Sequence, residues 1–531
     1  MSEAAPTPRL VPLLILVALL AWLPRSRAGE VFRPTPDAVE YAALARGLVE
    51  GRGFSLPIRA FHIPETISPG PARVPGAWTR APLLPLLLAP RLGEAADPRS
   101  RRAELAALQH TPAWLAIALA SLCAALTVTL GRHAGMDPWL RLRAAALAGV
   151  MIALHPPLFH VSMRLLTEPL ELTLLVLGLL GAFGLDDTRP RPALTGIAAG
   201  LLCLARPDGL LLALAILVAL TLRAGRGGLR IALPLMLIAA APWWLRAVLV
   251  HGTPTPGQSF LLHVASSEDV QWGFGGPVES LSPGLITTAV LGNLGACLAA
   301  LLEPKSLAFF APVIGLAAWR IGGSDDRRNS RREALRDPAT LTLALGLVLL
   351  LAKALVWSTR DELRFILPAV VLLVPLGALE TVRLLPRLAR FDRRLPQALL
   401  VILLGWLLLG PGVRVFKRMS RLPRGASWQD PDLERLRREV PPGPAIAATN
   451  PWAVWLATEN PTVLLPVRLD EAGLTRFLDA HRVAIVRLAP DAAHHAIPEP
   501  VRYGAWLRSA GWTEQRLGRS RIYRRPRRGR R

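Results

Sequence analysis

Apolar runs of nearly membrane-spanning length recur along the chain, and they restrict its fold more than any other feature. A helix needs about 20 apolar residues to cross a hydrocarbon core, and several runs are shorter, so their boundaries are soft. The chain is 52% hydrophobic with a mean hydropathy of +0.37, which excludes an ordinary soluble globule. We predict an all-α polytopic membrane protein with about 11 transmembrane helices, and the apolar segment 283–302 could be a further span or an interfacial helix. The eleven runs lie at 9–24, 106–131, 142–160, 169–185, 193–205, 208–222, 231–250, 303–319, 338–357, 364–381 and 396–412.

The basic residues follow a membrane topology rather than a nucleic-acid-binding surface. The net charge is +24, but the arginines are spread between the apolar runs and gathered in the C-terminal tail RRPRRGRR. We therefore expect contact with membrane lipids and none with nucleic acid. Cys123, Cys203 and Cys297 lie inside apolar stretches without metal-ligand spacing, so neither a disulfide framework nor a zinc site is predicted.

The arginine-rich connectors predict an orientation. With eleven crossings and a cytoplasmic N-terminus, connectors such as 132–143 and 327–336 face the cytoplasm, where arginine is in excess. Loop 25–105 and everything after about 413 then lie on the external, periplasmic side of the cell inner (plasma) membrane. The first run is followed by PRSRAGE, so a cleaved signal peptide is an alternative to a retained anchor. The segment APLLPLLLAP at 81–90 is too short to span and should lie along the membrane surface.

The character of the chain changes near residue 428. SWQDPDLERLRREV has helical periodicity, and PAIAATN, TVLLPV and VAIVRLAP are short β-type runs separated by turn residues. We predict a transmembrane domain at 1–412, whose external loop 25–105 carries the acidic motif described next. A small external soluble α/β domain with a basic tail should follow at 413–531.

An acidic helix start follows the first apolar run, in PTPDAVEYAALARGLVEGRGF at 34–54. Asp37, Glu40 and Tyr41 share one face of a helix that begins near Asp37, because they are three and four residues apart. Such a carboxylate could accept a proton from a sugar or lipid hydroxyl, with Glu40 and Tyr41 binding the substrate beside it. The alternative is structural, because Asp37 and Glu40 after Pro36 have the form of an N-terminal capping box.

Other charged residues lie at the predicted external ends of spans. Glu168, in Leu-Thr-Glu-Pro, could bind sugar hydroxyls or position Asp37, or it could only stabilise a helix N-terminus. Converging guanidinium groups could hold a phosphate with bidentate geometry, although each alone could be an interfacial anchor. The candidates are Arg80, Arg206, Arg246 and Arg364.

Six segments follow one another in the order DAVEYAALARGLVEGRGF, TRAPLLPLLLAP, LLTEPLELTLLVLGL, GIAAGLLCLARPDGLLL, APWWLRAVLVHGTPTP and RDELRFILPAVVLLVPLGAL. Together, over about residues 10–412, they resemble the bacterial GT-C glycosyltransferases. Within that fold the chain is most similar to the branch that contains the lipid A aminoarabinose transferase, the protein O-mannosyltransferases and the RgtA/B/C/D-like domain.

This resemblance implies transfer of a sugar from a polyprenyl-phosphate donor to a lipid, glycan or protein hydroxyl on the external face, usually with inversion at the anomeric carbon. Asp37 matches the acidic residue of the first external loop, which is the proposed base in that family. In the O-mannosyltransferases a glutamate follows it, whereas Ala38 follows here, which argues against a protein acceptor of that type. Arg206 and Arg364 are the favoured phosphate ligands, because the resemblance includes their flanking prolines.

Some relatives bind a divalent metal ion near this loop, so His62 and Glu65 could be metal ligands. The pair has no third partner in the sequence, so ordinary loop residues are the alternative, and no cofactor is predicted as required. Two other functions fit the spans and charges: a transporter or flippase for lipid-linked sugars, and a non-catalytic envelope assembly protein. No internal repeat typical of transporters is visible, and a scaffold should tolerate mutation of Asp37.

Overall fold

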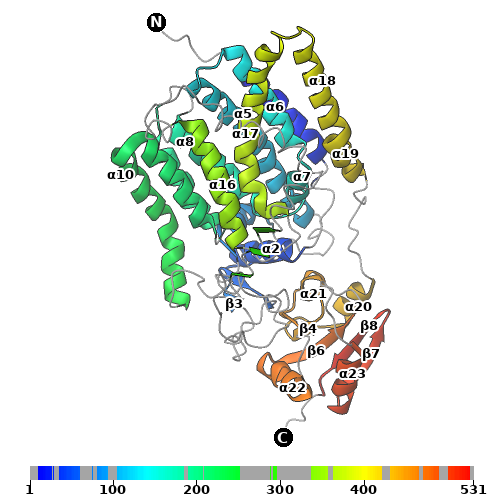
Figure 1. Cartoon of the computed structure of the whole chain (residues 1–531). Helices are drawn as coiled ribbons and strands as arrows, with labels where there is room; N and C mark the ends of the chain where they lie inside the picture. The colour runs from blue at the N-terminus through cyan, green and yellow to red at the C-terminus, as the bar shows by residue number, and fades with distance from the viewer. Residues whose placement is uncertain are drawn as a thin grey trace.

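The computed structural model of the chain has a bundle of apolar helices above a small mixed sheet, with helix α2 (Pro36–Val49) between them (Figure 1). It describes residues 10–26, 28, 35–59, 74–75, 80–93, 104–184, 189–206, 208–251, 337–356, 363–420, 431–465, 470–489 and 500–526, with short pieces between 287 and 295.

Each predicted apolar run that falls on described residues lies on helices, and the run at 303–319 lies outside them. Proline opens several of these helices, at Pro138, Pro156 and Pro192, because its fixed φ suits the first turn, where no backbone donor is needed. The elements are α1 (Leu10–Trp22), η1 (Leu23–Arg25), α5 (His110–His133), α6 (Pro138–Ala153), α7 (Pro156–Ser162), α8 (Glu168–Phe183), α9 (Pro192–Ala205), α10 (Gly209–His251), α16 (Pro338–Val356), η6 (Leu363–Ile366), α17 (Leu367–Leu388), α18 (Leu395–Leu407), the π-helix η7 (Leu408–Gly412) and α19 (Val413–Ser420).

Three described helical segments are each long and apolar enough to cross a membrane: Glu104–His133, Gly209–Val250 and Leu367–Leu388. Helices α6 and α7 meet that test only together, as a pair bent by 57°, and α1, α9 and the first part of α16 are shorter apolar helices. These helices are those of a multi-pass membrane protein. The predicted count of about 11 spans is not confirmed.

Helix α9 packs closely on α10 through Gly196 and Gly200, the small-xxx-small pattern typical of membrane helix pairs. A Cβ on Gly196 would lie 2.3 Å from the carbonyl oxygen of Ala232, so only glycine allows this approach. The two predicted runs on either side of the connector 223–230 lie within α10, which is interrupted by a sharp break at Gly225, where the backbone is not helical (φ 67°, ψ −166°). The break predicted between these runs therefore lies in the arginine-rich connector, at Gly225.

Short elements from the first loop lie at the end of the bundle that carries α2. They are β1 (Ser55–Leu56), β2 (Ile58–Arg59), β3 (Val74–Pro75), α3 (Leu83–Leu88) and η5 (Ala89–Arg91). Helix α3 occupies the segment predicted to lie along the membrane surface, and it is only six residues long, far too short to span.

The C-terminal sheet has the strand order β2-β5-β4-β6-β8-β7. The four strands from β2 to β6 are parallel, and β8 and β7 add an antiparallel hairpin. Strand β2 comes from the first loop, so the sheet takes its edge strand from a segment some 400 residues earlier, with Ile58 opposite Thr462. The predicted helix and three β-type runs are confirmed as α20 (Pro431–Glu439), β4 (Ala445–Ala448), β5 (Thr462–Leu464) and β6 (Val483–Leu488). The other elements are α21 (Pro451–Thr458), α22 (Glu471–Ala480), α23 (Pro500–Ser509), β7 (Thr513–Leu517) and β8 (Ser520–Arg524).

Candidate active site

Helix α2 presents its acidic first turn to the bundle. Its N-cap is Thr35, whose hydroxyl accepts a hydrogen bond from the backbone N–H of Ala38, and Pro36 follows as the first helical residue. The prediction that a helix begins near Asp37 is therefore confirmed. The alternative that Asp37 and Glu40 form a capping box is wrong, because the threonine before the proline already caps the helix.

Arg80 joins the two carboxylates of this helix. Its Nη2 lies 2.6 Å from Asp37 Oδ1 and its Nε lies 2.6 Å from Glu40 Oε2. The guanidinium carbon also lies 5.4 Å from the centre of the Tyr41 ring. Carboxylates three residues apart on a helix point the same way, so one planar guanidinium group can bind both.

Arg364 holds Asp37 from a second segment, η6. Its Nη1 lies 3.0 Å from Asp37 Oδ2 and 3.7 Å from Glu168 Oε1. The side chains of Asp37 and Arg364 are each 24% exposed, whereas Glu168 is buried. The reachable part of this cluster is therefore the Asp37–Arg364 pair.

A second, more deeply buried cluster surrounds Arg206. Its guanidinium group lies 2.9 Å from Glu168, 3.3 Å from Glu171 and 3.0 Å from Asp208. Thr167 connects the clusters, since its hydroxyl oxygen is 3.5 Å from both Arg206 Nη1 and the Tyr41 hydroxyl. The guanidinium group of Arg206 is thus buried and forms ion pairs with three carboxylates. This arrangement weakens its predicted role as a phosphate ligand.

The surroundings of Asp37 and Glu40 on α2 shift the pKa values of these two carboxyl groups in opposite directions. Burial alone would raise the pKa of Asp37, but Arg80 and Arg364 outweigh it, so this pKa lies below its ordinary value. Burial raises the pKa of Glu40, and its bonds to Arg80 and Trp452 offset only part of the rise. Asp37 is thus the ionised carboxylate of the pair, and Glu40 is the one nearer to holding a proton.

Trp452 connects the C-terminal sheet to this site. It lies at the start of α21, is 1% exposed, and donates a hydrogen bond from its indole Nε1 to Glu40 Oε1 at 2.9 Å. Asn450 caps α21 through the backbone N–H of Ala453, which fixes where the helix begins and hence where Trp452 points. Sequence analysis did not identify Trp452, because nothing in the local pattern marks a partner 412 residues away.

Of the remaining predicted site residues, Arg246 is described, and no ion pair found among the described residues joins it to these clusters. Arg246 donates to the carbonyl oxygen of Phe54 at 3.0 Å and lies over the rings of Phe54 and Trp243, as expected for an interfacial anchor. His62 and Glu65 lie outside the described residues, so the metal prediction remains a prediction. Among the described residues no group of three or more His, Cys, Asp or Glu side chains could hold a metal ion.

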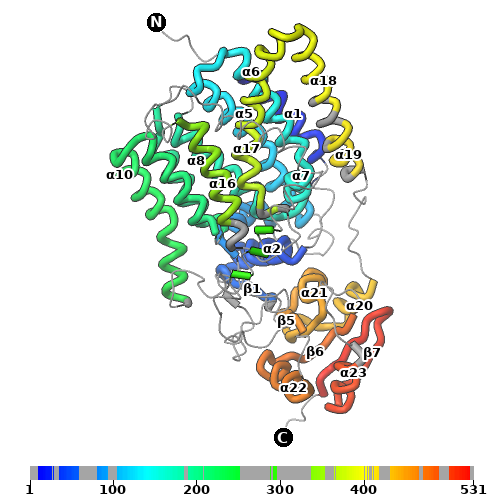
Figure 2. Tube along the Cα trace, in the orientation of Figure 1, coloured from blue at the N-terminus to red at the C-terminus, as the bar shows by residue number. Residues whose placement is uncertain are grey.

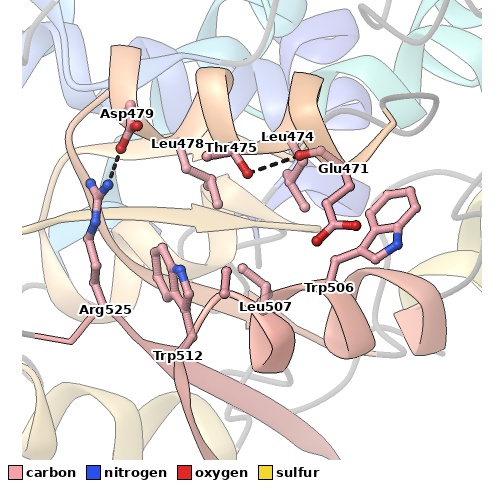
Figure 3. Close-up of a pocket in the computed structure, with 10 residues that line it drawn as sticks. Glu471, Leu474, Thr475, Leu478, Asp479, Trp506, Leu507, Trp512 and Arg525 are labelled. Carbon is pink, nitrogen blue, oxygen red and sulfur yellow. Dashed lines mark hydrogen bonds and ion pairs between the residues drawn. The ribbon is translucent and has the colours of Figure 1, made fainter.

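The C-terminal part also carries a small groove of about 30 Å³ between α22 and α23 (Figure 3). Leucine side chains and Trp512 line it, an ion pair between Asp479 and Arg525 lies at one end, and Trp506 lies near Glu471 at the other. It shares no residue with the clusters around Asp37 and Arg206.

No protein-family model and no curated protein sequence matches the chain. Solved structures do match in shape. ArnT from Cupriavidus metallidurans bound to undecaprenyl phosphate aligns with a TM-score of 0.56 and 15% identity over 98% of both chains, and its apo state aligns with 0.54 and 15% over 97% of both. The Archaeoglobus fulgidus oligosaccharyltransferase tethered with an acceptor peptide aligns with 0.55 and 13% identity over 91% of this chain and 69% of that chain. Both proteins are GT-C fold glycosyltransferases, and the chain has the GT-C fold.

Proposed function

We propose that this GT-C fold chain is an integral membrane glycosyltransferase that moves a hexosyl or pentosyl group from a polyprenyl-phosphate donor to a lipid, glycan or protein hydroxyl. The observation that carries the proposal is the pair formed by Asp37 and Arg364. In this pair an ionised, partly exposed carboxylate lies against a partly exposed guanidinium group, at the end of the apolar helix bundle. A sugar transferase with a lipid-linked donor needs a base and an anion-binding group side by side at that position.

In the proposed reaction Asp37 is the base. As the acceptor hydroxyl loses its proton to Asp37, its oxygen bonds to the anomeric carbon, and the bond from that carbon to the phosphate oxygen breaks. The electron pair leaves with the lipid phosphate, whose growing negative charge is met by Arg364 and Arg80. Both arginines touch Asp37 in the resting protein, at 3.0 and 2.6 Å.

This shared contact couples the two substrates. A base works best when its pKa is near the working pH, and Arg80 and Arg364 hold the pKa of Asp37 below that range. A donor phosphate bound to the same arginines would draw their charge away from Asp37 and raise its pKa. Donor binding would thus strengthen the base, and the donor-free protein would not deprotonate stray hydroxyl groups.

The remaining charged residues would position this pair. Glu168 lies 3.7 Å from Arg364 and 2.9 Å from Arg206, so it limits where the Arg364 side chain can lie. Its carboxylate and the Tyr41 hydroxyl are the candidates for binding sugar hydroxyls. Arg206 neutralises Glu168 together with Glu171 and Asp208, and we assign it that role in place of phosphate binding.

The sheet pairing supports one element of the proposed topology. Because β2 of the first loop pairs with β5, the loop that carries Asp37 and the C-terminal sheet lie on the same side of the membrane. The turn between α17 and α18, with Arg390 and Arg393, lies at the far end of the bundle in Figure 1. Arginine excess at that end supports a cytoplasmic position for this turn and an external position for the C-terminal sheet, in a protein that we propose lies in the inner (plasma) membrane.

The test is the variant Asp37→Asn in the full-length protein, reconstituted with a panel of polyprenyl-phosphate hexoses and pentoses. Loss of a base should lower the transfer rate by about 10² to 10⁴-fold, while the melting temperature stays within a few degrees. Asp137→Asn is the matched control, because Asp137 caps α6 at the exposed surface and should leave turnover unchanged. If Asp37→Asn keeps full turnover, or if the protein only moves donor across the membrane without transfer, the proposed enzyme function is wrong.

A further inference from the structure

Arg25 is a buried cation without a carboxylate partner among the described ion pairs. It ends η1, directly after the apolar helix α1, and is only 1% exposed. Its Nε donates to Ser162 Oγ at 2.9 Å, and its Nη1 donates to the carbonyl oxygens of Ala21 and Ala153 at 2.8 and 3.1 Å. In the described part of the chain its Nη2 has no hydrogen-bond partner. The guanidinium carbon also lies 5.6 Å from the centre of the Phe159 ring, but neutral acceptors and a ring face supply no opposite charge, and a buried cation is costly unless an anion joins it.

Arg25 lines an open cleft of about 510 Å³ between η1, η5 and the start of α5. Arg91 and His110 add two more nitrogen-bearing side chains to its wall, and none of its described lining residues is acidic. Arg91 is fixed by a 2.9 Å bond to Thr111 Oγ1 on α5. The cleft therefore has three basic or imidazole side chains in its wall that can donate to an anion, and its described lining includes no carboxylate to repel one.

The other wall of the cleft is apolar. Trp22 and Trp114 line it and are 42% and 54% exposed, with Ile117 one helical turn further along α5. The cleft lies where the apolar helix α1 ends and the apolar helix α5 begins, on the side where α1, α7 and α19 lie together in Figure 2. Tryptophan and arginine at the ends of apolar helices mark the level of lipid headgroups.

We propose that this cleft binds the phosphate group of a membrane lipid, at a site separate from the Asp37 cluster. The phosphate would accept hydrogen bonds from Arg25 Nη2 and from Arg91, and the acyl chain would run along Trp114 and Ile117. Phosphate fits because guanidinium groups bind its oxygens in pairs, and the apolar wall favours a lipid over a free phosphate ion. None of the lining residues belongs to the ion pairs around Asp37 and Arg206.

The test measures lipid binding to the purified full-length protein by native mass spectrometry. The probes are dioleoyl phosphatidic acid, dioleoyl phosphatidylcholine and inorganic phosphate, and all variants carry Arg364→Ala to weaken phosphate binding at the Asp37 cluster. Phosphatidic acid should bind more tightly than phosphatidylcholine. Arg91→Gln should weaken its binding about fivefold, the contribution of one cation near a lipid surface. Arg25→Gln should weaken it further, since that guanidinium group is the more deeply buried.

The apolar wall has its own variant and matched control. Trp114→Ala should weaken binding of phosphatidic acid and leave that of inorganic phosphate unchanged, whereas Trp139→Ala should change neither. Trp139 is 55% exposed against 54% for Trp114, and it lies outside the cleft. Arg143→Gln is the corresponding control for Arg91→Gln, because Arg143 is also exposed and lies outside the cleft.

Three results would overturn the proposal: equal binding of the two lipids, no change with Arg91→Gln, or equal losses in the controls. Arg91 is exposed, so its variant tests the site even where Arg25→Gln does not fold. If inorganic phosphate binds as tightly as phosphatidic acid and is lost equally with Arg91→Gln, the ligand is a free phosphate and the lipid assignment is wrong.

Discussion

Replacing Trp452 by phenylalanine should impair the proposed reaction from outside the helical bundle. The change removes the indole N–H that lies 2.9 Å from Glu40 Oε1 and keeps most of the apolar ring. Glu40 is completely buried, so water cannot replace the lost donor. A buried hydrogen bond to a charged group is worth about 1.5–3 kcal/mol, and we expect the free energy of unfolding to fall by about that amount.

The effect on rate follows from the charges. The bond from Trp452 lowers the pKa of Glu40, so its loss lets this pKa rise and Glu40 take up a proton. Arg80 then binds a neutral Glu40, and more of its charge acts on Asp37. A fall of one unit in the pKa of Asp37 weakens it as a base by about 1.4 kcal/mol, which corresponds to at most about a tenfold loss in rate.

The assay is sugar transfer by the full-length protein, with kcat and KM measured across pH, beside thermal unfolding. Trp455→Phe is the matched control, because Trp455 lies one turn later in α21 and is 4% exposed. Glu40→Gln should reproduce the loss in kcat, and the double variant Trp452→Phe with Glu40→Gln should add little to it. If Trp452→Phe and Trp455→Phe lower stability equally and neither changes kcat, Trp452 only packs and the argument fails.

Three further outcomes follow from the same contacts. Arg364→Lys and Arg364→Ala should each lower kcat/KM for donor by about a hundredfold, the cost of losing one donor to developing charge, whereas Arg246→Lys should change it little because Arg246 binds a backbone carbonyl. Arg80 and Arg364 lower the pKa of Asp37, so the stability that the protein gains from these ion pairs is fully present above the ordinary pKa of aspartate, ~3.9. It is lost only as the pH falls through the lower pKa of the folded protein. The difference in melting temperature between the wild type and Asp37→Asn should therefore stay constant from pH 8 to 5. In intact cells a membrane-impermeant maleimide should label Asp470→Cys and not Asp392→Cys, and the reverse pattern would invert the proposed topology.

Sequence patterns predicted those parts of the fold that depend on local periodicity. Apolar runs predicted the bundle helices because a helix in lipid must be apolar along its length, and the start of α2 was predicted near Asp37, after Pro36. The break expected between 222 and 231 lies at Gly225, whose non-helical backbone (φ 67°) interrupts α10 in a conformation that glycine adopts readily. Pairing of β2 with β5 was not predicted, since two residues of strand carry no period.

The candidate site could also be predicted only in part: most of its residues could be selected from the sequence, but their contacts could not. Asp37, Arg80, Glu168 and Arg364 could be selected because charges at the ends of apolar helices stand out, and the structure brings these four together. The partner of each could not be predicted, since their contacts join residues up to 327 positions apart. Glu171, missed in the sequence, lies one turn after Glu168 in Glu-Pro-Leu-Glu, a spacing that places both carboxylates on one face of α8 and could have identified it.

The contacts between the first loop and the C-terminal sheet change what a truncation would test. None of the candidate site residues selected from the sequence lies in the C-terminal part, and none of its side chains touches Asp37 among the described contacts. Yet β5 holds β2 in the sheet, and Trp452 holds Glu40 on the helix that carries Asp37. Removing the sheet would therefore free one edge of the loop and expose a buried carboxyl group. If a truncated protein lost hydrolysis of the donor, that loss would therefore not show that the sheet supplies a catalytic group. Comparison of Trp452→Phe with Trp455→Phe distinguishes a positioning role of Trp452 from a contribution to packing alone.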